Sequence, residues 1–222
     1  MLEFVQIDKA KGSQDYIDDL ASTLREKASL KNLEFRKNRF LAGSFRKIFD
    51  AVSRHDKLES LSLEKETLFH DDARGLKDLL RKASSLKKLK LESITEWPIS
   101  DVISGSPLEG LHILGTGYDN DVHKSLPLNI AGILGNLRVL NLGYNVINDH
   151  GAVNVAKYLT QNTSLKEVDL SVNQIREAGN SYDDEPTCLG PKAMTQQTYD
   201  DSSSTQNAFF RRTHYVPQIF LP

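Results

Sequence analysis

The chain is poor in cysteine: Cys188 is the only one among 222 residues, so no disulfide can form within it. Chains without disulfides are typical of reducing compartments, so we expect a cytoplasmic protein, with the nucleus as the alternative. The sequence also lacks any run of about 18 apolar residues, and its first residues lack the apolar core of a signal peptide. We therefore expect no membrane association.

An excess of charge of one sign is absent as well. The 28 Lys and Arg residues nearly balance the 30 Asp and Glu residues, and the part before Asn180 holds 25 of each sign. Proteins that bind nucleic acid usually carry a strongly basic domain, because they must neutralise phosphates. This balance argues against a nucleic-acid partner.

Motifs of catalysis and metal binding are missing too. The six histidines follow no metal-ligand spacing, and Cys188 has no cysteine companion. Gly115-Thr-Gly117 lacks the third glycine and the Lys-Ser/Thr pair of a phosphate loop, so we interpret it as a turn. No Gly-x-Ser-x-Gly elbow occurs. We expect no cofactor, no metal and no enzymatic activity. Three histidines near expected helix ends are interpreted as solvated: His55, His70 and His150.

The sequence does contain a repeat. The pattern Leu137-x-x-Leu140-x-Leu142-x-x-Asn145 recurs from Leu165 to Asn173. Earlier copies begin at Leu2, Leu30, Leu58, Leu86 and Leu108. The starts are evenly spaced, except that the step to Leu108 is shorter and the step from there to Leu137 is longer by a single residue. A fixed period of this size predicts a solenoid of about seven stacked coils.

Each coil contains two kinds of periodicity. The fourth and sixth positions of each copy alternate as in a strand with one buried face. Between the copies, apolar residues follow the i, i+3, i+4, i+7 spacing of a helix, as in Ile17, Leu20, Ala21 and Leu24. Similar stripes start at Phe45, Ala73 and Ala152. We expect N-caps at Ser13, Asp71 and Asp149.

Two coils depart from the regular pattern. Residues 86–107 leave room only for a short helix after Pro98, and we expect Trp97 to fill the space of the missing turns. The next coil is rich in glycine and carries Pro127, which confines its helix to about Leu128 to Leu134. The period ends near residue 179. We therefore predict a solenoid over residues 1–179 and a polar, disordered C-terminal tail over residues 180–222.

This repeat resembles the leucine-rich repeat of the ribonuclease-inhibitor type, which also occurs in Ran GTPase-activating proteins and in immune-receptor sensor regions. The best match runs from Asn145 through Gly151-Ala152 to Asn162-x-Ser164-Leu165. The resemblance implies an α/β horseshoe with parallel strands on the concave face, helices outside and a protein partner bound inside. It supplies no catalytic residues.

In this family an asparagine after each strand hydrogen-bonds to the backbone of adjacent coils. Asn38, Asn145 and Asn173 match it, whereas four other coils carry different residues: Ala10, Glu66, Ile94 and Thr116. The substitutions predict less regular middle coils within the same fold.

The outward strand positions give a candidate binding surface. Charge is frequent in the first four coils, vanishes around Gly110 and Val139, and returns as acids in the last coil. A neutral patch with an aromatic residue and charged borders is typical of a protein interface. The alternative is that Leu114 and Val139 merely lie under an irregular coil, and that the cluster of Lys87, Lys88 and Lys90 is a solvated strand face next to Glu92. The candidate partner-binding residues are Lys88, Lys90, His112, Leu114, Asn141, Tyr144, Glu167 and Asp169.

Three functions remain open. The first is a non-enzymatic scaffold that binds a protein partner on the concave face. The second is a GTPase-activating protein for a Ran-like small GTPase, although the chain lacks the long acidic tail that those activators often carry. The third is the recognition part of a ubiquitin-ligase adaptor or an immune receptor, which requires this chain to be a fragment. Because no capping repeat is evident, we also expect self-association through uncapped solenoid ends.

Overall fold

The computed structural model describes residues 2–94, 102–103, 106–115, 136–159 and 162–176. Seven strands form one sheet in which every neighbouring pair is parallel and the spatial order equals the chain order. The strands are β1 (Phe4–Asp8), β2 (Asn32–Arg36), β3 (Ser60–Glu64), β4 (Lys88–Glu92), β5 (Gly110–Leu114), β6 (Val139–Asn141) and β7 (Glu167–Asp169). This confirms the α/β solenoid of seven coils.

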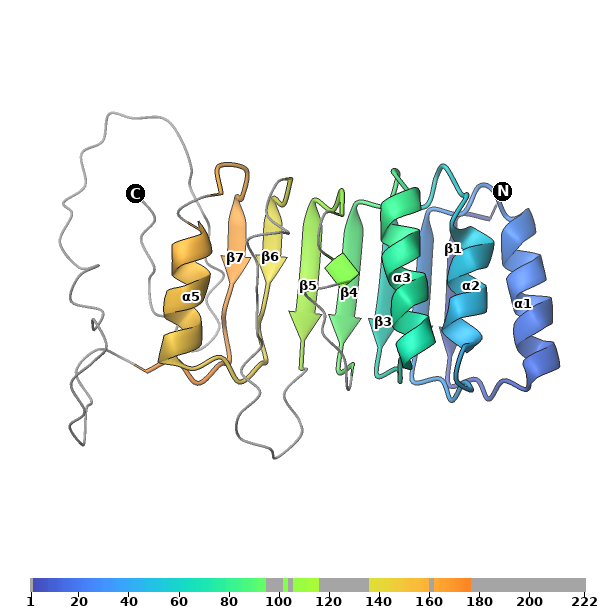
Figure 1. The fold of residues 1–222 in the computed structure, drawn as a ribbon, viewed down its shortest axis with the longest axis horizontal. Coiled ribbons are helices and arrows are strands. Elements are labelled where there is room, and N and C mark those ends of the chain that lie inside the picture. Colours follow the sequence, from blue (N-terminus) through green and yellow to red (C-terminus); the bar gives the residue numbers. More distant parts are fainter. Residues whose placement is uncertain (1, 95–101, 104–105, 116–135, 160–161, 177–222) are drawn as a thin grey trace.

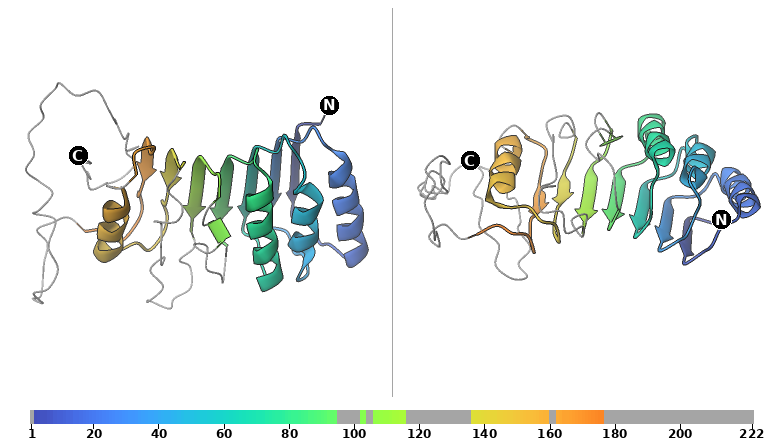
Figure 2. Two further views of the ribbon diagram at one scale, coloured as in Figure 1. Left: turned by 45° about the horizontal axis from the view of Figure 1, so that its top comes forward. Right: turned by 60° about the horizontal axis from the view of Figure 1, so that its bottom comes forward.

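The described helices all lie on one side of this sheet (Figure 1). They are α1 (Gln14–Glu26), α2 (Ser44–Val52), α3 (His70–Lys82) and α5 (Asp149–Leu159). The coils follow a gentle curve, with the strands on its inner side and the helices on its outer side (Figure 2). We call the side of the sheet that no described helix covers the open face.

The strand register reproduces the sequence repeat residue by residue. Leu33 lies beside Leu61 and Leu61 beside Leu89, each one full repeat apart. Leu89 then pairs with Leu111, across the short coil, and Leu111 pairs with Leu140, across the slightly longer one. The ladder therefore stays in phase, and differences in coil length are absorbed outside the strands.

The same backbone contact joins every coil to the next at the start of the strand. The carbonyl of the residue just before a strand accepts two N–H groups from the following coil, as the Glu3 carbonyl does from Lys31 and Asn32 at 2.9 and 3.0 Å. The other acceptors are the carbonyls of Lys31, Glu59, Lys87, Glu109 and Arg138. This contact occurs even beside the short coil, which explains how the sheet remains continuous there.

The core lies between the sheet and the helices. The predicted helical stripes are buried except for Leu20, which is half-buried, and the inward strand residues from Leu33 to Leu170 are buried. The centre of this core near the N-terminal end is aromatic: the ring of Phe45 lies 5.2 Å from that of Phe35 and 5.6 Å from that of Phe49. The first coil is less covered, since Leu2 and Phe4 are 46% and 50% exposed.

Two of the three predicted helix caps are wrong. Ser13 does cap α1, because its Oγ accepts a hydrogen bond from Tyr16 N at 3.3 Å. Asp71 lies inside the first turn of α3, and it is Asp72 whose Oδ2 accepts from Phe69 N at 2.9 Å. At α5, Asn148 accepts from Gly151 N at 2.9 Å, whereas Asp149 accepts from Arg176 N in the next coil at 2.7 Å.

Asp72 has a second function in packing. It is fully buried, and its Oδ1 accepts a hydrogen bond from Arg46 N, at the start of α2, at 2.9 Å. Because Gly43, the residue before α2, has no side chain to cap that helix, Asp72 supplies the acceptor from the neighbouring coil. Burial raises the pKa of Asp72 above its ordinary value.

The asparagine position also joins neighbouring coils. The Asn38 amide nitrogen donates to Ile7 O and its Oδ1 accepts from Ala10 N, at 2.9 and 2.8 Å. Asn173 makes equivalent bonds to Leu142 O and Ile147 N, both at 2.9 Å. The Asn145 amide nitrogen donates to Ile113 O at 2.7 Å. The side chain thus pairs backbone groups that the curved stack would otherwise bury unpaired.

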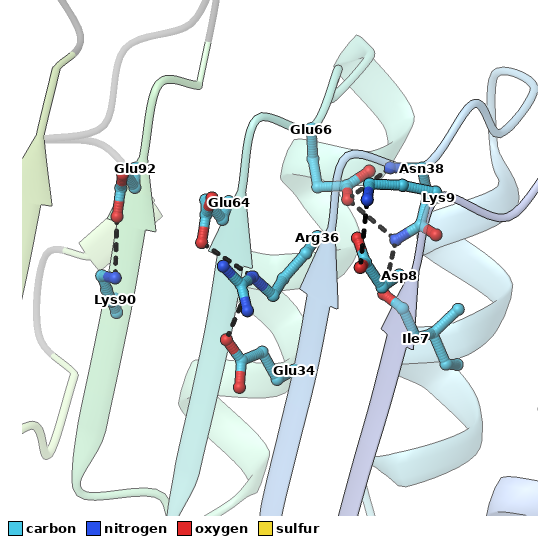
Figure 3. Close-up of polar contacts among 10 residues, drawn as sticks. All are labelled: Ile7, Asp8, Lys9, Glu34, Arg36, Asn38, Glu64, Glu66, Lys90 and Glu92. Carbon is cyan, nitrogen blue, oxygen red and sulfur yellow. Dashed lines mark hydrogen bonds and ion pairs between the residues drawn. The ribbon is translucent and has the colours of Figure 1, made fainter.

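Glu66 occupies this position in the third coil and keeps the acceptor half of the arrangement. Its Oε1 accepts from both the backbone N and the side-chain Nδ2 of Asn38, each at 2.9 Å (Figure 3). Glu66 is 2% exposed, and its Oε2 has no hydrogen-bond partner among the described residues. Burial raises the pKa of Glu66 to about 7. In the third coil the substitution is therefore chemical, and β3 keeps its register. Thr116 and most residues that follow Ile94 in its coil lie outside the described residues.

Several sequence predictions fall outside the described residues. They concern Trp97, Pro98, the helix from Leu128 to Leu134 and the tail over residues 180–222.

Candidate functional site

The strand register gathers the candidate residues on the open face in two parallel rows. The second row places Lys90, His112, Asn141 and Asp169 side by side on β4 to β7. The first row places Lys88 and Glu167 at either end, with Gly110 and Val139 between them. The structure thus brings six of the eight candidates into one surface through strand pairing alone.

Leu114 and Tyr144 lie at one edge of these rows. Leu114 ends β5 and is half-buried beside Glu92, with which it is in register. Tyr144 follows β6 and is 61% exposed. Its backbone is held on both sides, since Tyr144 O accepts from Gly115 N at 2.9 Å and Tyr144 N donates to Ser171 O at 3.0 Å. A fixed backbone that carries an exposed aromatic ring is suited to contact with a partner.

The exposed ring follows from a backbone feature that recurs in every coil. In each coil, one residue adopts a left-handed conformation, with φ between +52° and +61°, directly after β1 to β5 and a little beyond the ends of β6 and β7. The residues are Lys9, Lys37, Lys65, Ser93, Gly115, Tyr144 and Val172. The periodic sequence did not predict this conformation, because six of the seven are not glycine, the residue that usually signals it.

Most charges on the N-terminal part of the open face are paired with each other (Figure 3). Arg36 Nε lies 2.9 Å from Glu64 Oε2 and 3.8 Å from Glu34 Oε1. On β4, Lys90 Nζ lies 2.7 Å from Glu92 Oε2. These acids and bases therefore compensate each other locally on β2 to β4.

The C-terminal part has a different composition. His112 is half-buried, and burial together with the nearby ammonium of Lys90 lowers its pKa below the ordinary value, which favours the neutral ring. Asn141 Nδ2 donates to Asp169 Oδ2 at 3.0 Å, and Asn141 Oδ1 accepts from Gly143 N at 2.9 Å. These bonds fix the side chains of Asn141 and Asp169 on the surface.

One of the three histidines expected to be solvated is buried. His55, just after α2, is 6% exposed, and neither ring nitrogen has a hydrogen-bond partner among the described residues. The prediction of a solvated His55 is wrong because the turn folds under the following coil, where Ser85 Oγ donates to His55 O at 3.2 Å. His70 begins α3 and is exposed. His150 lies in the first turn of α5, and the prediction for its side chain falls outside what the structure describes.

No group of three or more His, Cys, Asp and Glu among the described residues is placed to hold a metal ion. Of the helices in those same ranges, none has the length and apolarity needed to cross a bilayer.

Comparison with known families identifies the repeat. The family model described as Leucine Rich repeat matches residues 136–156 and 161–179. No curated protein matches the chain closely enough to count as a relative. The family match falls on the coils of β6 and β7, the same part whose sequence shows the repeat most fully. With seven parallel strands in register, this shows that the chain carries leucine-rich repeats in an α/β solenoid.

Proposed function

We propose that this chain is a non-enzymatic scaffold that binds a protein partner on the open face, over β4 to β7. Leucine-rich repeats are suited to protein–protein interaction, because stacked coils present a long surface of exchangeable side chains. One observation supports the proposal above all. The pairing of β4 to β7 places an uncharged centre between charged residues at both ends, and the exposed Tyr144 ring lies at the edge of that surface. We further propose that the repeat is of the ribonuclease-inhibitor type and that the protein acts in the cytoplasm or nucleus.

The test is affinity capture with the immobilised full chain, comparing wild type with a double variant, Tyr144→Ala plus Asn141→Ala. Proteins that bind the open face should be retained by wild type and lost by the double variant. Because Asn141 also holds Gly143 and Asp169, Tyr144→Ala alone serves as the variant that changes the surface and leaves those bonds intact.

Tyr16→Ala is the matched control, since Tyr16 is an aromatic residue on α1 that is 40% exposed and far along the stack from β6. Unchanged capture by Tyr144→Ala and by the double variant would contradict the proposed face. A GTP-hydrolysis assay with a Ran-type GTPase provides a separate comparison: a scaffold should not accelerate hydrolysis, and stimulation would favour the activator function instead.

A further inference from the structure

Two charges in the first row of the open face have no compensating neighbour within the described residues. In the part of the chain that the structure describes, neither Lys88 nor Glu167 forms an ion pair, in contrast to the paired Lys90 and Glu92. Lys88 has the uncharged Ser60 and Gly110 beside it in the first row, and Glu167 has Val139. Over these described strands, one row therefore carries a cation available to a partner at one end and an available anion at the other.

The distance between these charges is set by the sheet. Lys88 and Glu167 are separated by three inter-strand steps, and parallel strands lie about 4.8 Å apart, so their Cα atoms are about 14 Å apart. Between them the row has a gap at Gly110. Gly110 is itself buried, and a Cβ added there would meet only Lys88 Cγ, at 3.5 Å, so the gap is the place of one missing side chain and is bordered by the Lys88 stem. Val139 supplies an apolar wall, half-buried, on the far side of the gap.

A binding segment that matches this row must present three side chains on one face. In an extended chain, residues i, i+2 and i+4 point the same way, and four residues span about 13 Å. In a helix, residues that share a face are about 10.5 Å apart after seven positions and about 16.5 Å apart after eleven. The first distance is shorter and the second is longer than the separation between Lys88 and Glu167. The row therefore fits an extended segment better than a helix.

We propose that the open face binds an extended protein segment that carries an acidic and a basic residue four positions apart, with an apolar residue midway between them. The acidic side chain pairs with Lys88, the apolar side chain fills the gap over Gly110 against Val139, and the basic side chain pairs with Glu167. This proposal rests on the proposed function and specifies the chemistry of the partner. Charge complementarity of this kind gives specificity and orientation more than raw affinity.

The experiment selects random linear peptides for binding to the immobilised full chain, in parallel for wild type, Lys88→Glu and the control variant Arg74→Glu. Arg74 lies on α3, on the side of the sheet opposite the open face, and is exposed. Wild type and Arg74→Glu should enrich sequences with an acid and a base four positions apart around an apolar residue. Lys88→Glu should instead enrich sequences with two bases at that spacing, because the substitution makes position 88 negative and a basic peptide residue then pairs with it.

The enriched wild-type peptide is then measured by fluorescence anisotropy. Its affinity should fall about threefold to tenfold for Lys88→Glu and for Glu167→Lys, because each reversal replaces an exposed ion pair with a repulsion of similar size. A peptide with a second base in place of its acid should regain that loss on Lys88→Glu. Failure to enrich any peptide, the same peptides on wild type and Lys88→Glu, or enrichment at helical spacing would overturn the proposal. If captured proteins depend on Tyr144 and not on Lys88 or Glu167, the proposed function stands and this inference fails. If they depend on none of the three, both fail.

Discussion

Replacing Glu66 with glutamine should stabilise the folded chain at neutral and alkaline pH. Glu66 is buried where other coils carry asparagine, and one of its oxygens accepts two hydrogen bonds from Asn38 while the other has no partner among the described residues. An ionised carboxylate in this position is costly because it loses its hydration. Glutamine keeps the accepting oxygen and replaces the unpaired oxygen with an amide donor. By analogy with the bond from Asn38 to Ile7 O, the acceptor at the equivalent position of the preceding coil is Phe35 O.

The magnitude follows from the pKa of Glu66, which burial raises from 4.5 to about 7. Below pH 4.5 the group is protonated in both the folded and the unfolded chain, so ionisation costs nothing. As the pH rises from there to about 7, the unfolded chain loses its proton first and the folded state is progressively destabilised. One unit of pKa shift corresponds to about 1.4 kcal/mol, so the total loss is about 3 kcal/mol and levels off above the folded pKa.

Urea unfolding of the full chain, followed by circular dichroism from about pH 4.5 to about pH 8, measures this effect. Wild type and Glu66→Gln should have similar stability at the acidic end, and the variant should exceed wild type by up to about 3 kcal/mol at the alkaline end. Glu59→Gln, an exposed glutamate near the start of β3, should differ from wild type by less than about 0.5 kcal/mol throughout. Parallel pH curves for wild type and Glu66→Gln would refute the reasoning, because they would mean that Glu66 titrates alike in both states.

Three further substitutions test the packing and the coil junctions, each by urea unfolding. Phe45→Ala removes a ring that is 1% exposed at the centre of the aromatic cluster and should cost about 3–5 kcal/mol, whereas a cost under about 1 kcal/mol would contradict that packing. Gly115→Ala places a Cβ 3.0 Å from Ser93 Oγ at φ +61° and should cost about 1–2 kcal/mol; no loss would show that the left-handed turn relaxes. Asn145→Ala removes the donor to three backbone carbonyls and should cost about 2–3 kcal/mol, and an unchanged unfolding midpoint would show that they find other partners.

The fold and the layout of the open face could be predicted from the sequence because both depend on spacing. A repeat of constant length fixes which residues become neighbours, so pairing Leu33 with Leu61 and Lys90 with His112 follows from counting once the strands are recognised. Burial of alternate strand residues follows from the same period. The short step to Leu108 and the slightly long step to Leu137 did not disturb this prediction, since each copy marks its own strand.

Features that depend on side-chain conformation could not be predicted in the same way. Asp71 and Asp72 are chemically identical, and only the direction of their side chains decides which one accepts from Phe69 N. His55 looked solvated because the sequence does not show that its turn lies beneath the next coil. The pairing of Arg36 with Glu64 and of Lys90 with Glu92 likewise depends on rotamers, so the sequence showed the charges without showing how they pair.

The constancy of the strand register has a consequence for how this surface can change. The short, the regular and the slightly long coil all place their strands in phase, so additions and deletions between strands leave the register of the open face undisturbed. The strand and the row of an exposed residue then determine its place on the open face. Binding specificity can therefore change through single substitutions at exposed positions such as Lys88 or Glu167, while the sheet and the core beneath stay the same.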